Sequence, residues 1–172
     1  MNGTPPPMLT LALDCSLRNT GYAVFVEDIL EEWGLITTKK IPGIGETESR
    51  IRNVSYIVSE LSGMANLSTR VVMEFPTGTQ SATAAISMYL AIGSVIGLAK
   101  GKNIDSYAIF PRTAKAAILW NSNATKEDVM AWAIRTHPDR GFPRAKTKFE
   151  HIADAILIFH ASRVPHIKMV KI

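Results

Sequence analysis

Two acidic residues, Asp14 and Glu74, each end a short segment that the residue pattern predicts to be a strand. Residues 8–13 form an apolar run typical of a buried central strand, and residues 70–74 form a second extended run. A carboxylate at the end of a buried strand is well placed for chemistry. The pattern therefore gives two candidate catalytic acids.

A third acid, Asp154, lies three residues after His151 in a segment whose apolar residues recur at helical spacing, 149–163. Residues three apart on a helix project to nearly the same side. The residues around Asp154, from Ile152 to Ile158, are otherwise all apolar. A carboxylate in such surroundings costs free energy unless it is paired or bound to a metal. A cap or a salt bridge to arginine is the alternative, but with two other acids at strand ends we expect a metal site.

The four side chains together form a ligand set that suits a hard divalent cation. We expect Asp14 and Glu74 to end the two central strands of one sheet, and the C-terminal helix to bring His151 and Asp154 over the same point. Three carboxylates and one imidazole favour Mg²⁺ or Mn²⁺, whereas zinc sites usually contain more Cys and His. Two such ions activate water and stabilise the leaving oxygen in phosphodiester hydrolysis.

The elements that position these residues follow from periodicity and turn residues. Extended segments at 22–26 and 32–37 come after short loops, which favours an antiparallel meander. Another strand is expected near 106–110. Helices are expected at 51–61, 81–99, 114–119 and from Thr125, as N-cap with Asp128, to near Pro138.

The uncharged helix at 81–99 is long enough to cross a membrane. Its many Ala, Ser, Thr and Gly residues argue against a spanning helix and for a helix buried on most sides. We expect no membrane association. Small residues also permit another helix to approach closely, so this helix is a candidate dimer interface; they are Ala82, Ala85, Ala91, Gly93 and Gly97.

Length and composition indicate one globular α/β domain. The chain has 172 residues and a net charge of +4. We expect a disordered extension at 1–7, a single domain at 8–165 and a tail at 166–172. The N-terminus does not resemble a secretory signal, and the single cysteine, Cys15, agrees with a reducing compartment, so a cytoplasmic location is expected.

The net positive charge indicates a polyanionic partner, because the neutralisation of phosphates dominates the affinity of proteins for nucleic acids. Residues 140–148 concentrate this charge around one aromatic residue with no acid between them. A solvated loop is the alternative to DNA contact. The cations of this basic run are Arg140, Arg144, Lys146 and Lys148.

Three motifs in order resemble those of the RuvC-type Holliday junction resolvases, a branch of the ribonuclease H-like nucleases. Residues 11–14, followed by Thr20-Gly21-Tyr22, resemble the first motif, and residues 71–74 the second acidic motif. Residues 150–156 resemble the C-terminal acidic helix, in which the position of His151 is occupied by Asp or His. The resemblance extends from about residue 8 to residue 163.

The resemblance implies a ribonuclease H-like fold with a five-stranded mixed sheet flanked by helices. It also implies a homodimer with one metal-dependent site per subunit, which makes paired nicks in four-way or other branched DNA. Lys115 and Lys126 fall where the family carries basic residues. The family places an aromatic residue a few positions after the second acid; Thr77 lies near that place, and Phe75 is the candidate substitute or a core residue. Cys15-Ser16 replaces the frequent Pro-Gly, so that loop is expected to differ.

Three other classes of protein are alternatives to a junction resolvase. A sugar-kinase or actin-like ATPase shares the sheet topology but needs two domains and glycine-rich phosphate loops. An inactive DNA-binding relative is expected to lose at least one acid, and all are present. A nuclease for RNA–DNA hybrids shares the fold, and only the C-terminal motif and the small-residue helix argue against it.

Overall fold

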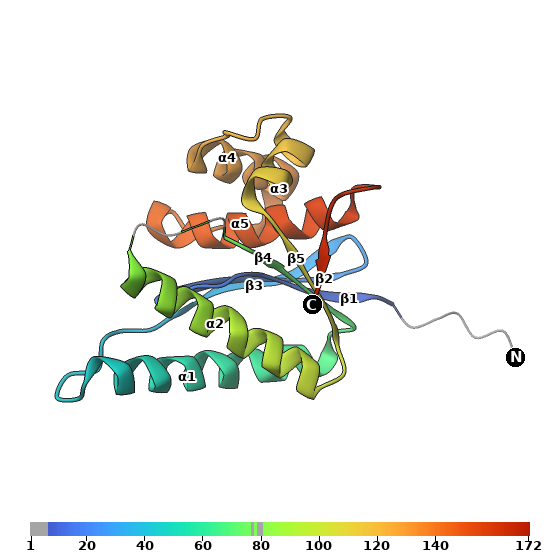
Figure 1. Ribbon diagram of the computed structural model, residues 1–172. Coiled ribbons are helices and arrows are strands. Elements are labelled where there is room, and N and C mark those ends of the chain that lie inside the picture. Colours follow the sequence, from blue (N-terminus) through green and yellow to red (C-terminus); the bar gives the residue numbers. More distant parts are fainter. Residues whose placement is uncertain (1–6, 77, 79–80) are drawn as a thin grey trace, which may run out of the picture.

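The structure is a computed structural model that describes residues 7–76, 78 and 81–172. The disordered extension expected at 1–7 lies, apart from Pro7, outside the described residues. The described chain forms a mixed sheet flanked by helices, as expected (Figure 1). The strands are β1 (Leu9–Asp14), β2 (Asn19–Val26), β3 (Ile29–Thr37), β4 (Arg70–Glu74), β5 (Asp105–Ile109) and β6 (Val170–Lys171).

The strand order is β3-β2-β1-β4-β5-β6. Strands β1, β2 and β3 form the predicted antiparallel meander, and β1 pairs in parallel with β4, which pairs in parallel with β5. β1 and β4 are therefore the central pair. The expected count of five strands was too low, because Val170 and Lys171 of the C-terminal tail pair with β5 as a short antiparallel edge strand.

Helices cover both faces of the sheet. α1 (Glu46–Leu67) and α2 (Ala82–Gly101) lie together on one face, and α5 (Lys146–Arg163) crosses the other (Figure 1). α3 (Pro111–Leu119) and α4 (Lys126–Thr136) pack against α5, and a short 3-10 turn, Pro138–Arg140, leads into the segment before α5. α4 begins with the predicted capping box between Thr125 and Asp128.

Each face of the sheet has its own core because side chains alternate along the strands. On β1, Leu11 and Leu13 pack toward α1 and α2, whereas Ala12 faces α5. The small side chain of Ala12 leaves room for α5 to lie close to the sheet. On the same face, Phe25 of β2 stacks on Phe159 of α5, with ring centroids 3.5 Å apart.

Helix α2 is not buried on most sides, which corrects the sequence prediction. Its described core residues are Ala91, Ile92, Val95 and Ala99. The opposite face is exposed, including Ile86 at 56% and Tyr89 at 47%. By length and composition α2 is also the one helix of the described residues that would suffice to cross a membrane. Hydropathy indicated an apolar helix, but it did not indicate that only one side is covered.

Candidate metal centre

The sheet brings the first two acids to the same edge. Asp14 ends β1 and Glu74 ends β4, and these parallel strands pair in register up to Leu13 opposite Met73. The next residue of each strand is the acid. Both carboxylates therefore leave the two central strands side by side, as the sequence predicted.

Helix α5 adds His151 and Asp154 from the other layer. It passes so close to β2 that a Cβ atom on Gly21 would lie 2.1 Å from the backbone oxygen of His151. Gly21 is opposite Asp14 in the β1–β2 pair. Because residue 21 has no side chain, α5 can lie this close to β2 and therefore to Asp14.

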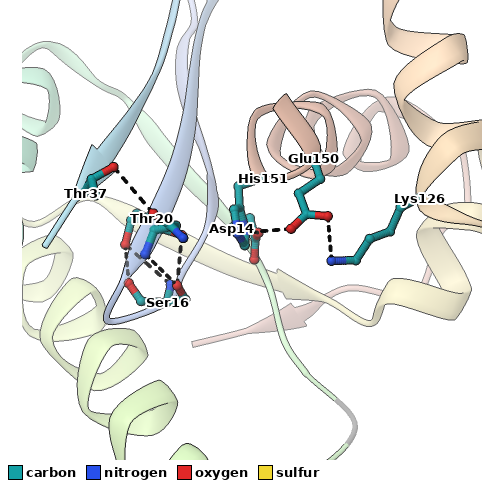
Figure 2. A network of polar contacts seen from close by, with 8 residues as sticks. Asp14, Ser16, Thr20, Thr37, Lys126, Glu150 and His151 are labelled. Carbon is teal, nitrogen blue, oxygen red and sulfur yellow. Dashed lines mark hydrogen bonds and ion pairs between the residues drawn. The ribbon is translucent and has the colours of Figure 1, made fainter. Parts of the chain in front are cut away.

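The imidazole of His151 lies between two carboxylates. Its Nδ1 is 2.6 Å from Oδ2 of Asp14, and its Nε2 is 3.6 Å from Oε1 of Glu150. The other oxygen of Glu150 accepts a hydrogen bond from Nζ of Lys126 at 2.8 Å. Figure 2 shows these contacts as one line from Asp14 to Lys126. Glu150 was given no role from the sequence, although its place next to His151 on a helix was a signal.

The acids are close enough to perturb one another. Burial, then the charges of Asp14 and Asp154, raise the pKa of Glu74 well above its usual value. Burial and the charge of Asp14 raise the pKa of Asp154 to about 7, against the opposing charges of Lys115, Lys126 and His151. Crowded, partly desolvated carboxylates of this kind are a mark of functional sites.

The donor set fits a hard divalent cation. Burial and mutual repulsion disfavour the charged forms of Glu74 and Asp154, and a bound cation would offset both effects. Among the described residues, however, no three His, Cys, Asp or Glu side chains stand ready in coordinating positions. Both ring nitrogens of His151 face carboxylates, so binding an ion through this ring requires one of those contacts to open.

Burial would lower the pKa of His151, but its hydrogen bond with Asp14 and the charges of Asp14, Glu150 and Asp154 outweigh that effect and raise the pKa.

Cys15, directly after Asp14, is buried in the α1–α2 core. Burial, with the charges of Asp14 and Glu74, raises the pKa of its thiol. Cys15 is thus a small residue of the core.

Of the predicted DNA-contacting residues, two lie at the centre. The charge of Lys115 acts on Glu74 and Asp154, and its Nζ donates to the backbone oxygen of Ala124 at 2.8 Å. Lys126 acts on the same acids and pairs with Glu150. The basic run lies in the segment before α5 and in the first turn of α5, with Arg144 and Lys148 exposed.

The other three predicted residues are more constrained. Lys146 forms an ion pair with Glu127, so its charge is partly neutralised. Phe75 is half-buried, with its ring 5.8 Å from that of Phe110 and 6.4 Å from that of Tyr89. Thr77, the alternative position for the family's aromatic, lies outside the described residues. Arg140 is half-buried at the end of the 3-10 turn.

The comparisons with known proteins found matches among solved structures only. No protein-family model matches the sequence, and no curated protein matches it. Among solved structures, Thermus thermophilus RuvC in complex with Holliday junction substrate superposes with a TM-score of 0.70 at 21% identity, covering 90% of this chain and 92% of that one. A second Thermus thermophilus RuvC structure gives 0.67 at 22% identity, with the same coverage. Over nearly its whole length, this chain therefore has the ribonuclease H-like fold of RuvC.

Proposed function

We propose that the protein is a divalent-metal-dependent endonuclease that nicks four-way or other branched DNA. The observation that carries the proposal is the meeting of Asp14, Glu74 and Asp154 at one edge of a RuvC-like sheet, close enough that the charges of Asp14 and Asp154 raise the pKa of Glu74 and the charge of Asp14 raises that of Asp154. The relative with the same fold, RuvC of Thermus thermophilus, is recorded with a Holliday junction substrate.

Asp14, Glu74, Asp154 and His151 would hold Mg²⁺ or Mn²⁺, in our proposal two ions. When bound, such ions activate water and stabilise the departing oxygen of a phosphodiester. The protein's own contribution is to fix the ligands. β1 and β4 hold two carboxylates on rigid strands, and α5 holds Asp154 and the imidazole one helical turn apart. Lys115 and Lys126 add positive charge at the edge of this cluster and would attract the phosphate of the strand to be cut.

Contact with the flanking DNA is assigned to Arg140, Arg144, Lys146 and Lys148. This basic run spans the segment before the catalytic helix and the first turn of that helix, and Lys148 lies one helical turn before His151. Phosphates held there would remain near the metal centre. Phe75 is proposed as an aromatic contact at the same edge of the sheet, since it directly follows Glu74.

A homodimer would supply two centres for paired nicks. The exposed face of α2 carries Ile86, Tyr89, Gly93 and Gly97, which recur at spacings of three and four and so share one side of the helix. Exposed apolar patches of this kind mark interaction surfaces. A two-fold contact through this face, the α2 stripe, would relate two sites symmetrically. Ala91, also expected at the interface, is instead 1% exposed and faces the core of its own protomer.

The test is incubation of purified protein with labelled four-way, forked, linear duplex and RNA–DNA hybrid substrates, each with Mg²⁺, Mn²⁺ or chelator. We expect nicking of the four-way or forked DNA that requires the metal. Cleavage confined to the hybrid would replace the proposal by a ribonuclease H-type activity. Binding without cleavage under all metal conditions would indicate a DNA-binding protein without nuclease activity.

A further inference from the structure

A half-open cavity of about 570 Å³ lies next to α1 and α2, on the face of the sheet opposite α5. It is bordered by the β1–β2 turn, the segment after β3, and the first turns of α1 and α2. Arg18, Lys40 and Arg50 line it, together with the hydroxyl-bearing residues Ser16 and Ser49. Neither the metal centre nor the basic run includes these residues.

The charge of the cavity is positive. Glu46 is the single acid among its described lining residues, and it pairs with Arg50, which leaves Arg18 and Lys40. Within the part of the chain that the structure describes, neither of these two has an acidic partner. Two exposed cations that face one cavity without a counterion favour an anionic ligand.

Two helix N-termini add to this preference. α1 begins at Glu46 after Gly45, which gives no side-chain cap, and carries Glu46 and Glu48 in its first turn; α2 begins at Ala82 with no acid in its first turn, and the side chain of Ser81 accepts from the N–H of Ala84. Figure 1 shows both helices starting on the same side of the molecule. The N-terminus of a helix carries partial positive charge and N–H groups that suit phosphate. Ser49, Thr83 and Ala84, from these first turns, line the cavity.

The walls are fixed by hydrogen bonds that do not involve a ligand. Thr38 donates through Oγ1 to the backbone oxygen of Leu17 at 2.5 Å and through its backbone N–H to that of Arg18 at 3.0 Å. The backbone N–H of Ile41 donates to Oγ of Ser49, and Nδ2 of Asn53 donates to the backbone oxygen of Lys39, both at 3.0 Å. Preorganised walls reduce the entropic cost of binding.

The cavity adjoins the metal centre through the β1–β2 turn. Ser16, which lines it, is two residues after Asp14, and the turn is closed by hydrogen bonds between Ser16 and Thr20. Figure 2 shows this turn on the side of Asp14 away from Lys126. A DNA strand that passes over this turn would reach both the cavity and the centre.

We infer that this cavity binds a backbone phosphate of the DNA substrate, as an anchor separate from the metal centre and from the basic run. The inference rests on the proposed function, because the ligand is taken to be DNA. Arg18 and Lys40 would contact the phosphate oxygens, and the α1 and α2 N-termini would supply N–H donors. The anchor would fix the register of the strand that passes Asp14.

The test compares two doubly substituted proteins that lose the same charge. Arg18→Gln with Lys40→Gln removes the cavity's unpaired cations. Lys39→Gln with Arg52→Gln removes two cations that do not line the cavity: Lys39 from the segment that also holds Lys40, and Arg52 from α1, where it pairs with Glu48. Affinity for a labelled four-way junction is measured in Ca²⁺ across a salt series. Cleavage in Mg²⁺ and thermal unfolding are measured on the same samples.

We expect the cavity variant to lose about tenfold in affinity at low salt and to lower the slope of log affinity against log salt by about 0.7 to 0.9 for one phosphate. The control should change much less, and both should unfold like the wild type. Ala84→Glu, which adds a carboxylate to the cavity wall, should also weaken binding. Equal losses in the cavity and control variants would overturn the inference.

The outcomes separate the anchor from the nuclease. A wild type that binds the junction through the cavity but never cuts it supports the anchor and contradicts the proposed activity. A wild type that cuts, with an unchanged salt slope in the cavity variant, overturns the anchor and leaves the activity in place. A wild type that binds no DNA overturns both.

Discussion

The backbone carbonyl of His151 occupies the space that a side chain on Gly21 would need. A Cβ atom there would also lie 2.4 Å from the carbonyl carbon of His151 and 2.9 Å from the nitrogen of Ile152. All three contacts are with backbone atoms, which cannot turn away as a flexible side chain can. The close packing of β2 and α5 therefore depends on glycine at residue 21, and the position of His151 over Asp14 depends on that packing.

Gly21→Ala is expected to push α5 away from the sheet. Overpacking of a tight core costs about 1–3 kcal/mol, and here the added methyl meets backbone. We expect a lower midpoint in chemical denaturation and a loss of cleavage. Gly63→Ala is the control, because a Cβ on Gly63 of α1 meets nothing within 4 Å. That change should stabilise the helix by about 0.5–1 kcal/mol; equal stability of Gly21→Ala and wild type would contradict the packing argument.

The low pKa of His160 predicts that protonation of this residue destabilises the fold in acid. Nε2 of His160 lies 3.0 Å from Nε2 of His137, and this contact links α5 to the end of α4. Burial, then the charge of His137, lower the pKa of His160 from 6.5 to about 4. Unfolding then takes up a proton between these values, so the stabilising contribution is complete above pH 6.5 and is lost as the pH falls toward 4.

His160→Phe should remove most of this dependence, because the ring keeps its contacts with Phe25, Trp132 and Phe159 but cannot be protonated. The measurement is the free energy of unfolding by urea at pH 7, 6, 5 and 4.5. Glu74 and Asp154, whose pKa values are raised, contribute the opposite pH dependence in both proteins, so we expect the wild type to lose stability relative to the variant as the pH falls. Parallel curves would show that His160 does not carry the acid response.

Much of the metal centre could be predicted because it follows from local patterns. The apolar runs before Asp14 and Glu74 marked the ends of two strands, and the spacing of His151 and Asp154 marked one helix face. The start of α5 was set three residues late, at Phe149, because the apolar stripe begins there while the helix itself begins at Lys146. Lysines are good helix formers but give no periodic signal.

Features that depend on distant pairing could not be predicted. β6 is two residues long, and its pairing with β5 joins segments more than sixty residues apart. The cavity assembles Arg18, Lys40 and Arg50 from three elements, none of which shows a basic run. The exposure of α2 depends on which of its sides meets α1 and the sheet, and an evenly apolar helix does not reveal this.

The basic run is expected to contribute to DNA affinity mainly through its exposed cations. Arg144→Ala with Lys148→Ala should lower the salt slope by about 0.9 for each lost duplex phosphate contact. Adding Lys146→Ala should lower it less, because Lys146 already pairs with Glu127. The comparison is Lys100→Ala with Lys168→Ala, which removes two exposed cations elsewhere. Identical slopes for both double variants would mean that the run does not contact DNA.

The α2 stripe predicts that Gly93→Arg yields a folded monomer. A Cβ on Gly93 meets nothing within its own protomer, so the arginine should disturb only a contact with a second copy. Sedimentation should show a dimer for the wild type and a monomer for the variant, which should nick one strand without paired cutting. Gly63→Arg, on the exposed side of α1, is the matched control and should remain dimeric. A wild type that stays monomeric at micromolar concentration with junction bound would refute the dimer.

The central claim is that Asp14, Glu74 and Asp154 together hold the catalytic metal. Single-turnover nicking of a four-way junction in Mg²⁺ is the most direct measurement, made on Asp14→Asn, Glu74→Gln and Asp154→Asn with Glu31→Gln, an exposed acid of β3, as control. Each of the three changes should slow nicking on the order of 10³-fold or more, because a metal ligand is lost, while junction binding and unfolding stay near wild type. The control should cut normally. Wild-type nicking by any of the three folded variants would contradict the metal centre described above.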